Sequence, residues 1–304
     1  MTETDPGLEA APVVDVNEDE EDFREGSLAG DAWRELRRRP LFWFCVSIIL
    51  VLVVAAIVPQ LFTSKDPLLG DQRNNLQGPS SEHWFGTDLQ GRDQYARVVY
   101  GARVSIVVAF FVTLAAALVA LTFGSLAGFY GGGLDGVISR ITDVWFAIPG
   151  VLGGIVMLQL FERRSIFTLC LVLIVFGWPT MLRLVRSSVI AVKNADYVDA
   201  ARALGASDRR IIAQHILPNA LTPLVVFMAI TFGVVIAAEA ALTFIGVGLR
   251  KPAVSWGLII SDSRGRIQTH AYLLLLPGLV LSMAVFSFIL LGDLLRDAFD
   301  PRQR

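Results

Sequence analysis

Ionisable side chains inside long apolar runs are the first candidates for chemistry in this sequence. Glu239 lies in such a run, between Ala237 and Thr243, and Asp143 stands near the start of another. Lipid solvates charge poorly, so an acidic group at membrane depth is expected to face a bundle interior or a wet path. Two interpretations of Glu239 stay open. It lines a translocation path or an interface with a second membrane subunit, as we also expect for Asp143, or it lies just beyond the membrane boundary.

Metal ions, nucleotides and covalent catalysis have no recognisable site among the 304 residues. The three histidines are scattered and lack metal-ligand spacing, so we interpret His215 and His270 as polar residues near the membrane surface. The Gly-x-x-x-x-Gly-Lys-[Ser/Thr] loop that cradles ATP phosphates does not occur. No nucleophile, base and metal set is clustered, which disfavours an integral-membrane enzyme. We expect no catalytic residue, no metal and no cofactor in this chain.

The elements that position these residues are predicted to be membrane helices. Hydrophobic residues make up 54% of the chain and charged residues only 18%, which indicates a lipid environment. Crossing a hydrocarbon core of roughly 30 Å takes about 20 helical residues. Apolar stretches of about this length run approximately over residues 41–62, 104–129, 144–161, 165–182, 216–238 and 271–292. They lack the period-two alternation of a membrane barrel, so we predict an all-α, polytopic protein with six transmembrane helices.

Basic residues near the helix ends predict how the chain is oriented. Arg34 and the arginines at 37–39 precede the first span, which places the N-terminus in the cytoplasm. Six spans return the C-terminus to the same side, together with the basic segment 183–210. Several other arginines then face outside, and we attribute this exception to the length of the first outer loop. The net charge of −2 gives no reason to expect nucleic acid as a partner.

The N-terminal residues and two outer segments complete the domain organisation. Residues 1–33 are acidic and poor in aromatics, so we predict a disordered tail before a transmembrane domain that covers residues 34–304. The segments 63–103 and 249–270 are long enough to contact an external partner, and an ordinary solvated linker is the alternative.

The predicted cytoplasmic segment 195–218 has the signals of a compact helix-turn-helix. Gly205 is expected to end a short helix, because glycine accepts the left-handed conformation that follows a helix C-terminus. Ser207 is expected to cap the next helix, with Asp208 favourable in its first turn. Pro218 suits the start of the fifth span, where its missing N–H costs nothing.

This segment resembles the EAA loop of ABC importer permeases, whose pattern is Glu-Ala-Ala, three residues, Gly, nine residues and Ile-x-Leu-Pro. The matching positions are Asp199, Ala200, Ala201, Gly205, Leu217 and Pro218. Asp199 stands in place of Glu with its charge retained, and His215 stands in place of Ile, as is usual in the peptide/nickel branch. In that family the loop is the coupling helix that docks on the ATPase. The resemblance therefore implies a coupling role for these residues and for Ser207 and Asp208.

Further blocks resemble the C-type subunits of dipeptide/oligopeptide importers. Before the second span the matching residues are Gly86, Thr87, Asp88, Gly91, Arg92 and Asp93. At the C-terminal end they are Gly292, Asp293, Arg296, Asp297, Asp300 and Pro301. Asp143 with Pro149 matches the start of the third span. Together with the EAA loop, these blocks extend the resemblance over about residues 41–302.

The resemblance implies a type I ABC importer permease of the bacterial cytoplasmic (inner) membrane. Its expected partners are a B-type permease subunit in a heterodimer, two ATPase subunits and an extracytoplasmic peptide-binding protein or lipoprotein. ATP and Mg would then bind to the ATPase subunits and not to this chain. Nickel and glutathione importers share the architecture, so they remain alternative solutes. A self-sufficient secondary transporter is the alternative from another class, and it predicts ionisable pairs deep in the spans.

Overall fold

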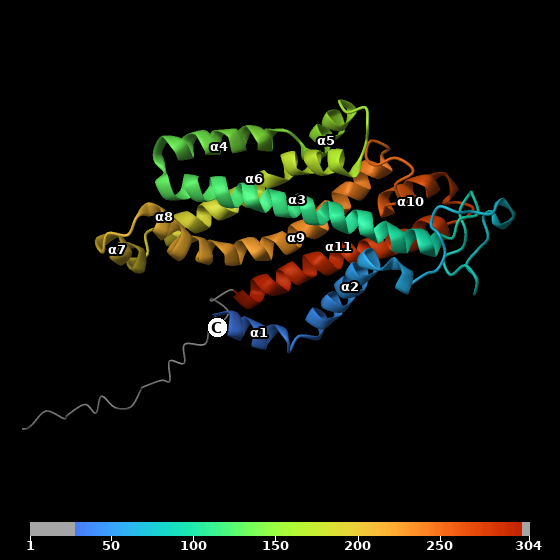
Figure 1. Ribbon diagram of the computed structural model, residues 1–304, viewed down its shortest axis with the longest axis horizontal. Helices are drawn as coiled ribbons and strands as arrows, with labels where there is room; N and C mark the ends of the chain where they lie inside the picture. The colour runs from blue at the N-terminus through green and yellow to red at the C-terminus, as the bar shows by residue number, and fades with distance from the viewer. Residues whose placement is uncertain (1–27, 300–304) are drawn as a thin grey trace, which may run out of the picture.

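The computed structural model describes residues 28–299, and in this part of the chain regular structure is helical throughout (Figure 1). The long α-helices are α2 (Pro40–Ile57), α3 (Gln94–Tyr130), α4 (Gly132–Ala147), α6 (Ile166–Val192), α9 (Leu217–Phe244) and α11 (Tyr272–Phe299). The shorter α-helices are α1 (Leu28–Leu36), α5 (Gly150–Gln159), α7 (Asp196–Ala203), α8 (Asp208–Ile211) and α10 (Trp256–Ser263). The all-α prediction is confirmed.

Five helices are long and apolar enough to cross a membrane, and a sixth crossing arises if the bent pair α4 and α5 counts as one span. The structure places the third predicted span, over residues 144–161, across two helices joined by a bend. Helix α4 begins twelve residues earlier, at Gly132, and the axes of α4 and α5 meet at 83°. The break lies at Ile148 and Pro149, because a residue before proline is pushed out of the helical region and Ile148 has ψ 116°.

Most spanning helices extend beyond the apolar runs that predicted them. Helix α3 covers 37 residues, and its first turns carry the polar residues that precede the apolar run. Helical hydrogen bonding continues into water wherever a cap supports it, and here Asp93 accepts a hydrogen bond from the backbone N–H of Ala96. Near the N-terminus, α1 covers Leu28–Leu36, so residues 28–33 of the expected tail are helical. Residues 1–27 lie outside the described part.

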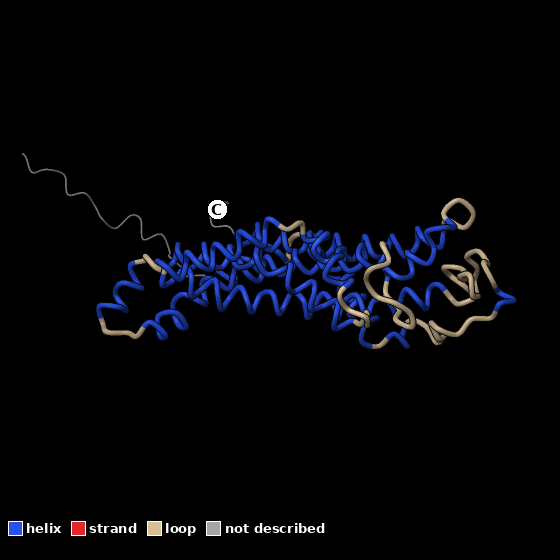
Figure 2. Tube along the Cα trace, turned by 90° about the horizontal axis from the view of Figure 1, so that it is seen from above, coloured by secondary structure: helices blue, strands red, loops and turns tan. Residues whose placement is uncertain are grey.

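The helices form an elongated bundle whose two ends differ in content (Figures 1 and 2). Helices α7 and α8 project at one end, and α1 and the last turns of α11 lie toward the same end. The segment between α2 and α3 and helix α10 lie at the opposite end. The chain therefore returns to its starting end only if α4 and α5 together make one crossing.

Small residues bring helix α3 close to α6 at the centre of the bundle. A Cβ atom on Gly124 would lie 3.0 Å from the carbonyl oxygen of Leu182, and one on Gly128 would lie 2.9 Å from that of Arg186. Ala116 and Ala120, nearer the middle of α3, are fully buried in the same cluster as Leu182 and Val185 of α6. Such residues let helix backbones approach in lipid, where close packing replaces the hydrophobic effect as the main attraction between helices.

Candidate functional site

The segment from α7 to the start of α9 is a rigid projection at one end of the bundle. After α7 the backbone N–H of Gly205 donates to the carbonyl of Arg202, and that of Ala206 donates to Ala201, both at 3.0 Å. Gly205 has φ +79°, so these bonds form the paired C-terminal motif that glycine favours. The predicted turn at Gly205 is confirmed.

Two buried side chains attach this projection to the bundle. Val198 of α7 and Ile211 of α8 are fully buried and pack in the same cluster as Val185 and Val189 of α6. Ser207 occupies the N-cap position of α8 as predicted, but its side chain makes no capping hydrogen bond, while Asp208 lies in the first turn. The apolar anchors, more than a side-chain cap, therefore position the two short helices.

The outward face of the projection carries the exposed EAA-like residues. Ala200 is exposed, and Asp199 forms a 2.7 Å ion pair with Arg202. Leu204 at the turn is 89% exposed. Ala201, by contrast, packs partly against the bundle, so only part of the expected smooth alanine face is open. A large apolar side chain held at the tip of a rigid turn is suited to inserting into a partner's surface.

The end of the segment leads into α9 through an irregular turn. Residues Ile212–Ile216 form a π-helical turn, and Pro218 lies in the first turn of α9 as predicted. His215 lies 6.3 Å from the ring of Tyr197, measured between centroids, and Leu217 is half-buried. Asn219 donates hydrogen bonds to Tyr197 and to the carbonyl of His215. These contacts tie α7 to the start of the fifth span.

At the opposite end, Asp88 is the centre of a buried ion network. Its carboxylate accepts from Arg92 at 2.7 Å and from Arg97 at 2.6 Å, and Arg97 also reaches Asp262 of α10 at 3.2 Å. Burial acts to raise the pKa of Asp88, but the hydrogen bonds from Arg92 and the charge of Arg97 outweigh it, so the pKa lies below its usual value. The network joins the outer segment to α3 and α10.

The other signature residues before α3 shape the same outer segment. Asp93 caps α3 and accepts from Lys65 at 2.9 Å and from His83 at 2.8 Å. Burial acts to raise the pKa of Asp93. The hydrogen bonds from the Ala96 N–H, Lys65 and His83 outweigh burial, so the pKa of Asp93 lies below its usual value. Gly86 and Gly91 have φ +73° and +69°. The Thr87 hydroxyl donates to the carbonyl of Asn74. These residues shape the segment's backbone, and Asp93 also lines a small cavity of about 200 Å³ beside Lys65 and Trp84.

Glu239 is fully buried inside the chain. Its carboxylate accepts hydrogen bonds from Ser105 of α3 at 3.0 Å, from Ser255 before α10 at 2.9 Å and from Thr243 one turn along α9 at 3.1 Å. Within this chain the Glu239 side chain is 0% exposed, so it does not reach the chain's own surface. In this structure Glu239 joins three elements near the outer end of the bundle.

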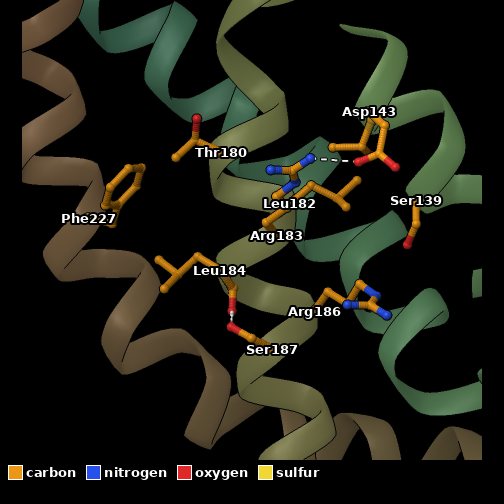
Figure 3. Close-up of a pocket in the computed structure, with 10 residues that line it drawn as sticks. Ser139, Asp143, Thr180, Leu182, Arg183, Leu184, Arg186, Ser187 and Phe227 are labelled. Atoms are coloured by element: carbon orange, nitrogen blue, oxygen red, sulfur yellow. Dashed lines mark hydrogen bonds and ion pairs between the residues drawn. The ribbon is translucent and has the colours of Figure 1, made fainter. Parts of the chain in front are cut away.

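Asp143 lines a cavity of about 690 Å³ between α4, α6 and α9 (Figure 3). It forms a 2.7 Å ion pair with Arg183, and both side chains are about half exposed. The guanidinium of Arg183 also lies 4.0 Å from the ring centre of Phe146. One turn along α6, Arg186 binds Asp135 through two hydrogen bonds of 2.5 and 2.6 Å. Asp143 therefore faces the open space of this cavity.

The C-terminal signature is partly structural in this chain. A Cβ on Gly292 would lie 3.0 Å from the backbone nitrogen of Ile230, so this glycine allows α11 to approach α9. Asp297 contacts Arg39 at 3.4 Å, while Asp293 and Arg296 are exposed. Asp300 and Pro301 lie outside the described residues.

Sequence reasoning missed the partners that surround these acidic groups. Thr243 stands four residues after Glu239, a spacing that could have indicated a contact on one helix face. Ser105, Ser255, Arg97 and Asp262 carry no such local signal, because they come from segments far apart in the sequence. Within residues 28–299, no three His, Cys, Asp or Glu side chains are grouped so as to hold a metal ion.

Comparisons with known proteins agree with this architecture. Residues 120–304 match the family of binding-protein-dependent transport system inner membrane components, and residues 27–79 match the N-terminal TM domain of oligopeptide transport permease C. A methionine ABC transporter, MetNI, solved in inward-facing conformations, has a chain with TM-score 0.55 and 21% identity, over 66% of this chain and 96% of that one. This likeness shows the fold of a type I ABC importer permease.

Curated relatives are similar over nearly their whole length. The dipeptide transport system permease protein DppC of Alkalihalophilus pseudofirmus is 39% identical, over 90% of both chains. The oligopeptide transport system permease protein OppC of Bacillus subtilis is 34% identical over 91% of both chains. The glutathione transport system permease protein GsiD of Pectobacterium atrosepticum is 34% identical, over 89% of this chain and 91% of the relative. The chain therefore belongs to the binding-protein-dependent transport system inner membrane components, as a multi-pass DppC/OppC-like permease of the inner membrane.

Proposed function

We propose that this chain forms half of the path through which an ATP-driven importer moves dipeptides or oligopeptides across the inner membrane. Three observations support this function: the family, the relatives that are named as peptide permeases, and the charged cavity between α4 and α6. Relatives named as glutathione permeases keep that tripeptide as an alternative solute. Nickel is disfavoured as a solute held by this chain, because the polar side chains of the cavity wall are Asp, Arg, Ser and Thr, without His or Cys ligands.

The chain is proposed to act with subunits that it does not contain. A B-type permease would complete the path, two ATPases would bind ATP and Mg, and an external binding protein would deliver the solute. The chain itself carries out no bond-breaking step in this proposal. The termini and the projection of α7 and α8 would face the cytoplasm, where the ATPases are.

The observation that carries the coupling assignment is the exposed turn between α7 and α8. Leu204 is 89% exposed, yet the turn that presents it is fixed by Gly205 and by the buried Val198 and Ile211. A side chain that is pre-positioned in this way loses little conformational entropy on docking. We infer that Leu204 enters a groove on an ATPase subunit, with Asp199 and Ala200 beside it.

Two variants of the turn test this assignment. Leu204→Ser removes the apolar contact and leaves the chain's own core untouched, and Gly205→Val strains a backbone with φ +79°. Both should lower co-purification of the ATPases and ATP-dependent peptide uptake by about tenfold or more, since an anchor residue contributes about 2 kcal/mol or more to binding. Membrane abundance of the chain should not change.

A matched control lies at the other end of the bundle. Leu69 is 74% exposed in the outer segment, so Leu69→Ser removes a similar exposed side chain without touching the projection. It should leave ATPase co-purification at the wild-type level. Wild-type ATPase association and uptake in both turn variants would show that coupling lies elsewhere in the chain.

A further inference from the structure

The cavity between α4, α6 and α9 has walls of two kinds. Its polar side comes from α4 and α6, where Asp143, Arg183 and Arg186 lie among Ser and Thr side chains (Figure 3). Phe227 of α9 and the leucines of α6 supply the apolar part. A volume of about 690 Å³ falls in the range of about 300–1,000 Å³ that small-ligand sites occupy.

The two ion pairs that join α4 to α6 differ in exposure. Asp135 and Arg186 are 21% and 31% exposed and share two short hydrogen bonds, which suits a fixed connection. Asp143 and Arg183 are 52% and 51% exposed, and a single hydrogen bond of 2.7 Å joins them. A single hydrogen bond holds this pair at the edge of the cavity, so a ligand in the cavity can reach both partners.

Because the Asp135–Arg186 pair already connects α4 to α6, the Asp143–Arg183 pair is available for another role. Arg186 keeps the first half of α4 against α6 even when Asp143 and Arg183 separate. Helix α4 buries only Thr142 completely, and it ends at the 83° bend, so the region around Asp143 has room to adjust. The Asp143–Arg183 pair is therefore a place where an incoming ligand can replace each partner with its own charges.

We propose that Asp143 and Arg183 form a subsite for a zwitterionic solute, with the ammonium group at Asp143 and the carboxylate at Arg183. The choice of a peptide as this solute rests on the proposed function, while the charge arrangement rests on the cavity alone. An extended dipeptide spans about 7 Å between its ends, so its two termini can meet two side chains that separate by a few ångströms. The guanidinium offers a planar pair of donors, which matches a terminal carboxylate.

Charge balance explains why the subsite selects zwitterions. When a zwitterion replaces the ion pair, each protein charge exchanges one partner for another and none is left alone. A peptide blocked at one end leaves either Asp143 or Arg183 without an ionic partner, and one blocked at both ends supplies neither charge. Each loss of a charge-assisted hydrogen bond should weaken binding about tenfold or more.

A thiol placed in the cavity reports on occupancy directly. Ser187 lines the cavity, and its hydroxyl donates only within its own helix, to Leu184, so Ser187→Cys leaves the ion pairs intact. The natural cysteines, Cys45 and Cys170, are buried and give a low background. The rate of labelling by a charged methanethiosulfonate is measured in membranes permeable to reagents on both faces. Ser207→Cys, exposed on the projection, is the matched control for labelling outside the cavity.

The probes are alanyl-alanine, its N-acetyl form, its amide, and the doubly blocked compound. Free alanyl-alanine should slow labelling of Ser187→Cys about fivefold or more at saturation, while the doubly blocked compound should not. Adding Asp143→Asn should abolish the preference for a free amino group and keep that for the carboxylate. Adding Arg183→Gln should abolish the preference for a free carboxylate and keep the preference for a free amino group. Labelling of Ser207→Cys should be unaffected by every probe.

The outcomes separate this subsite from the proposed function. Equal protection by free and blocked peptides, no protection by any of them, or an end-group preference unchanged in both neutralised variants would each overturn the subsite. The first two comparisons need no charge variant, so they hold even if Asp143→Asn or Arg183→Gln fails to fold. Peptide uptake by the complex in proteoliposomes is measured alongside. Absent uptake with intact protection refutes the proposed function only, whereas uptake without protection refutes the subsite only.

Discussion

Glu239 shows how a single buried acidic side chain can connect several elements of a membrane protein. The carboxylate is fully buried and accepts hydrogen bonds from three hydroxyl groups on two helices and a loop. A buried polar group is tolerated when its bonds are satisfied, and removing the acceptor leaves the donors unpaired. These hydrogen bonds join α3, α9 and the start of α10.

Substitutions at Glu239 should separate shape from charge. Glu239→Ala leaves the Ser105 and Ser255 hydroxyls without their acceptor and should lower stability by about 1–3 kcal/mol, whereas Glu239→Gln keeps an acceptor and should cost less. Thermal unfolding of the purified protein in detergent measures both. Glu162→Ala, at an exposed position, serves as the control and should have little effect. Equal stability of Glu239→Ala and wild type would contradict the role given to this residue.

Asp88 makes the stability of the outer segment depend on pH. Its folded pKa lies below the ordinary value of 3.8, so the folded state favours the ionised form. The stabilisation is complete above about pH 4 and is lost as the pH falls through the folded pKa. The thermal stability of wild type should therefore exceed that of Asp88→Asn by a constant amount at neutral pH, and the two should converge below pH ~4. Parallel curves down to acidic pH would argue against this ion network.

At the scale of the helices, the same substitution at two glycines of α11 should lower stability at Gly292 but not at Gly278. A Cβ on Gly292 would lie 3.0 Å from the backbone nitrogen of Ile230, so Gly292→Ala should push α11 from α9 and cost about 1–3 kcal/mol. Gly278 has open space around it, so Gly278→Ala should be neutral or slightly stabilising. Thermal unfolding of both variants is the measurement. A cost at Gly278 as large as that at Gly292 would mean that helix contact is not the cause.

The whole molecule predicts where its segments lie relative to the membrane. Helices α4 and α5 together must cross once if α7 and α8 are to lie at the same end as α1, as they do in Figure 1. We therefore expect Ser207→Cys to be labelled by an impermeant thiol reagent from the cytoplasm only, and Ser81→Cys in the outer segment from the outside only. A reporter fused to the N-terminus should share the compartment of Ser207. Opposite compartments for the N-terminus and Ser207 would show that the bent pair does not cross.

How much of this protein its sequence determines depends on the range of the interactions involved. Apolar runs long enough to cross a membrane determined the all-α class and most of the spanning helices, because backbone hydrogen bonds in lipid must close within each segment. Glycine determined the turn at Gly205 through its own backbone freedom. The EAA-like spacing and the signature before α3 were enough to indicate the family, since both are local patterns.

Only the tertiary structure decided which groups meet. The 83° bend between α4 and α5 combines a proline break with packing on α6, and its angle could not be read from the apolar run. Glu239 meets the Ser105 and Ser255 hydroxyls, and Asp143 meets Arg183, only because the fold brings separate segments of the chain together. A side chain's type sets what it can bind, but its partners depend on how helices approach one another. That approach is governed by small residues such as Gly128 and Gly292, whose effect appears only when two helices are placed together.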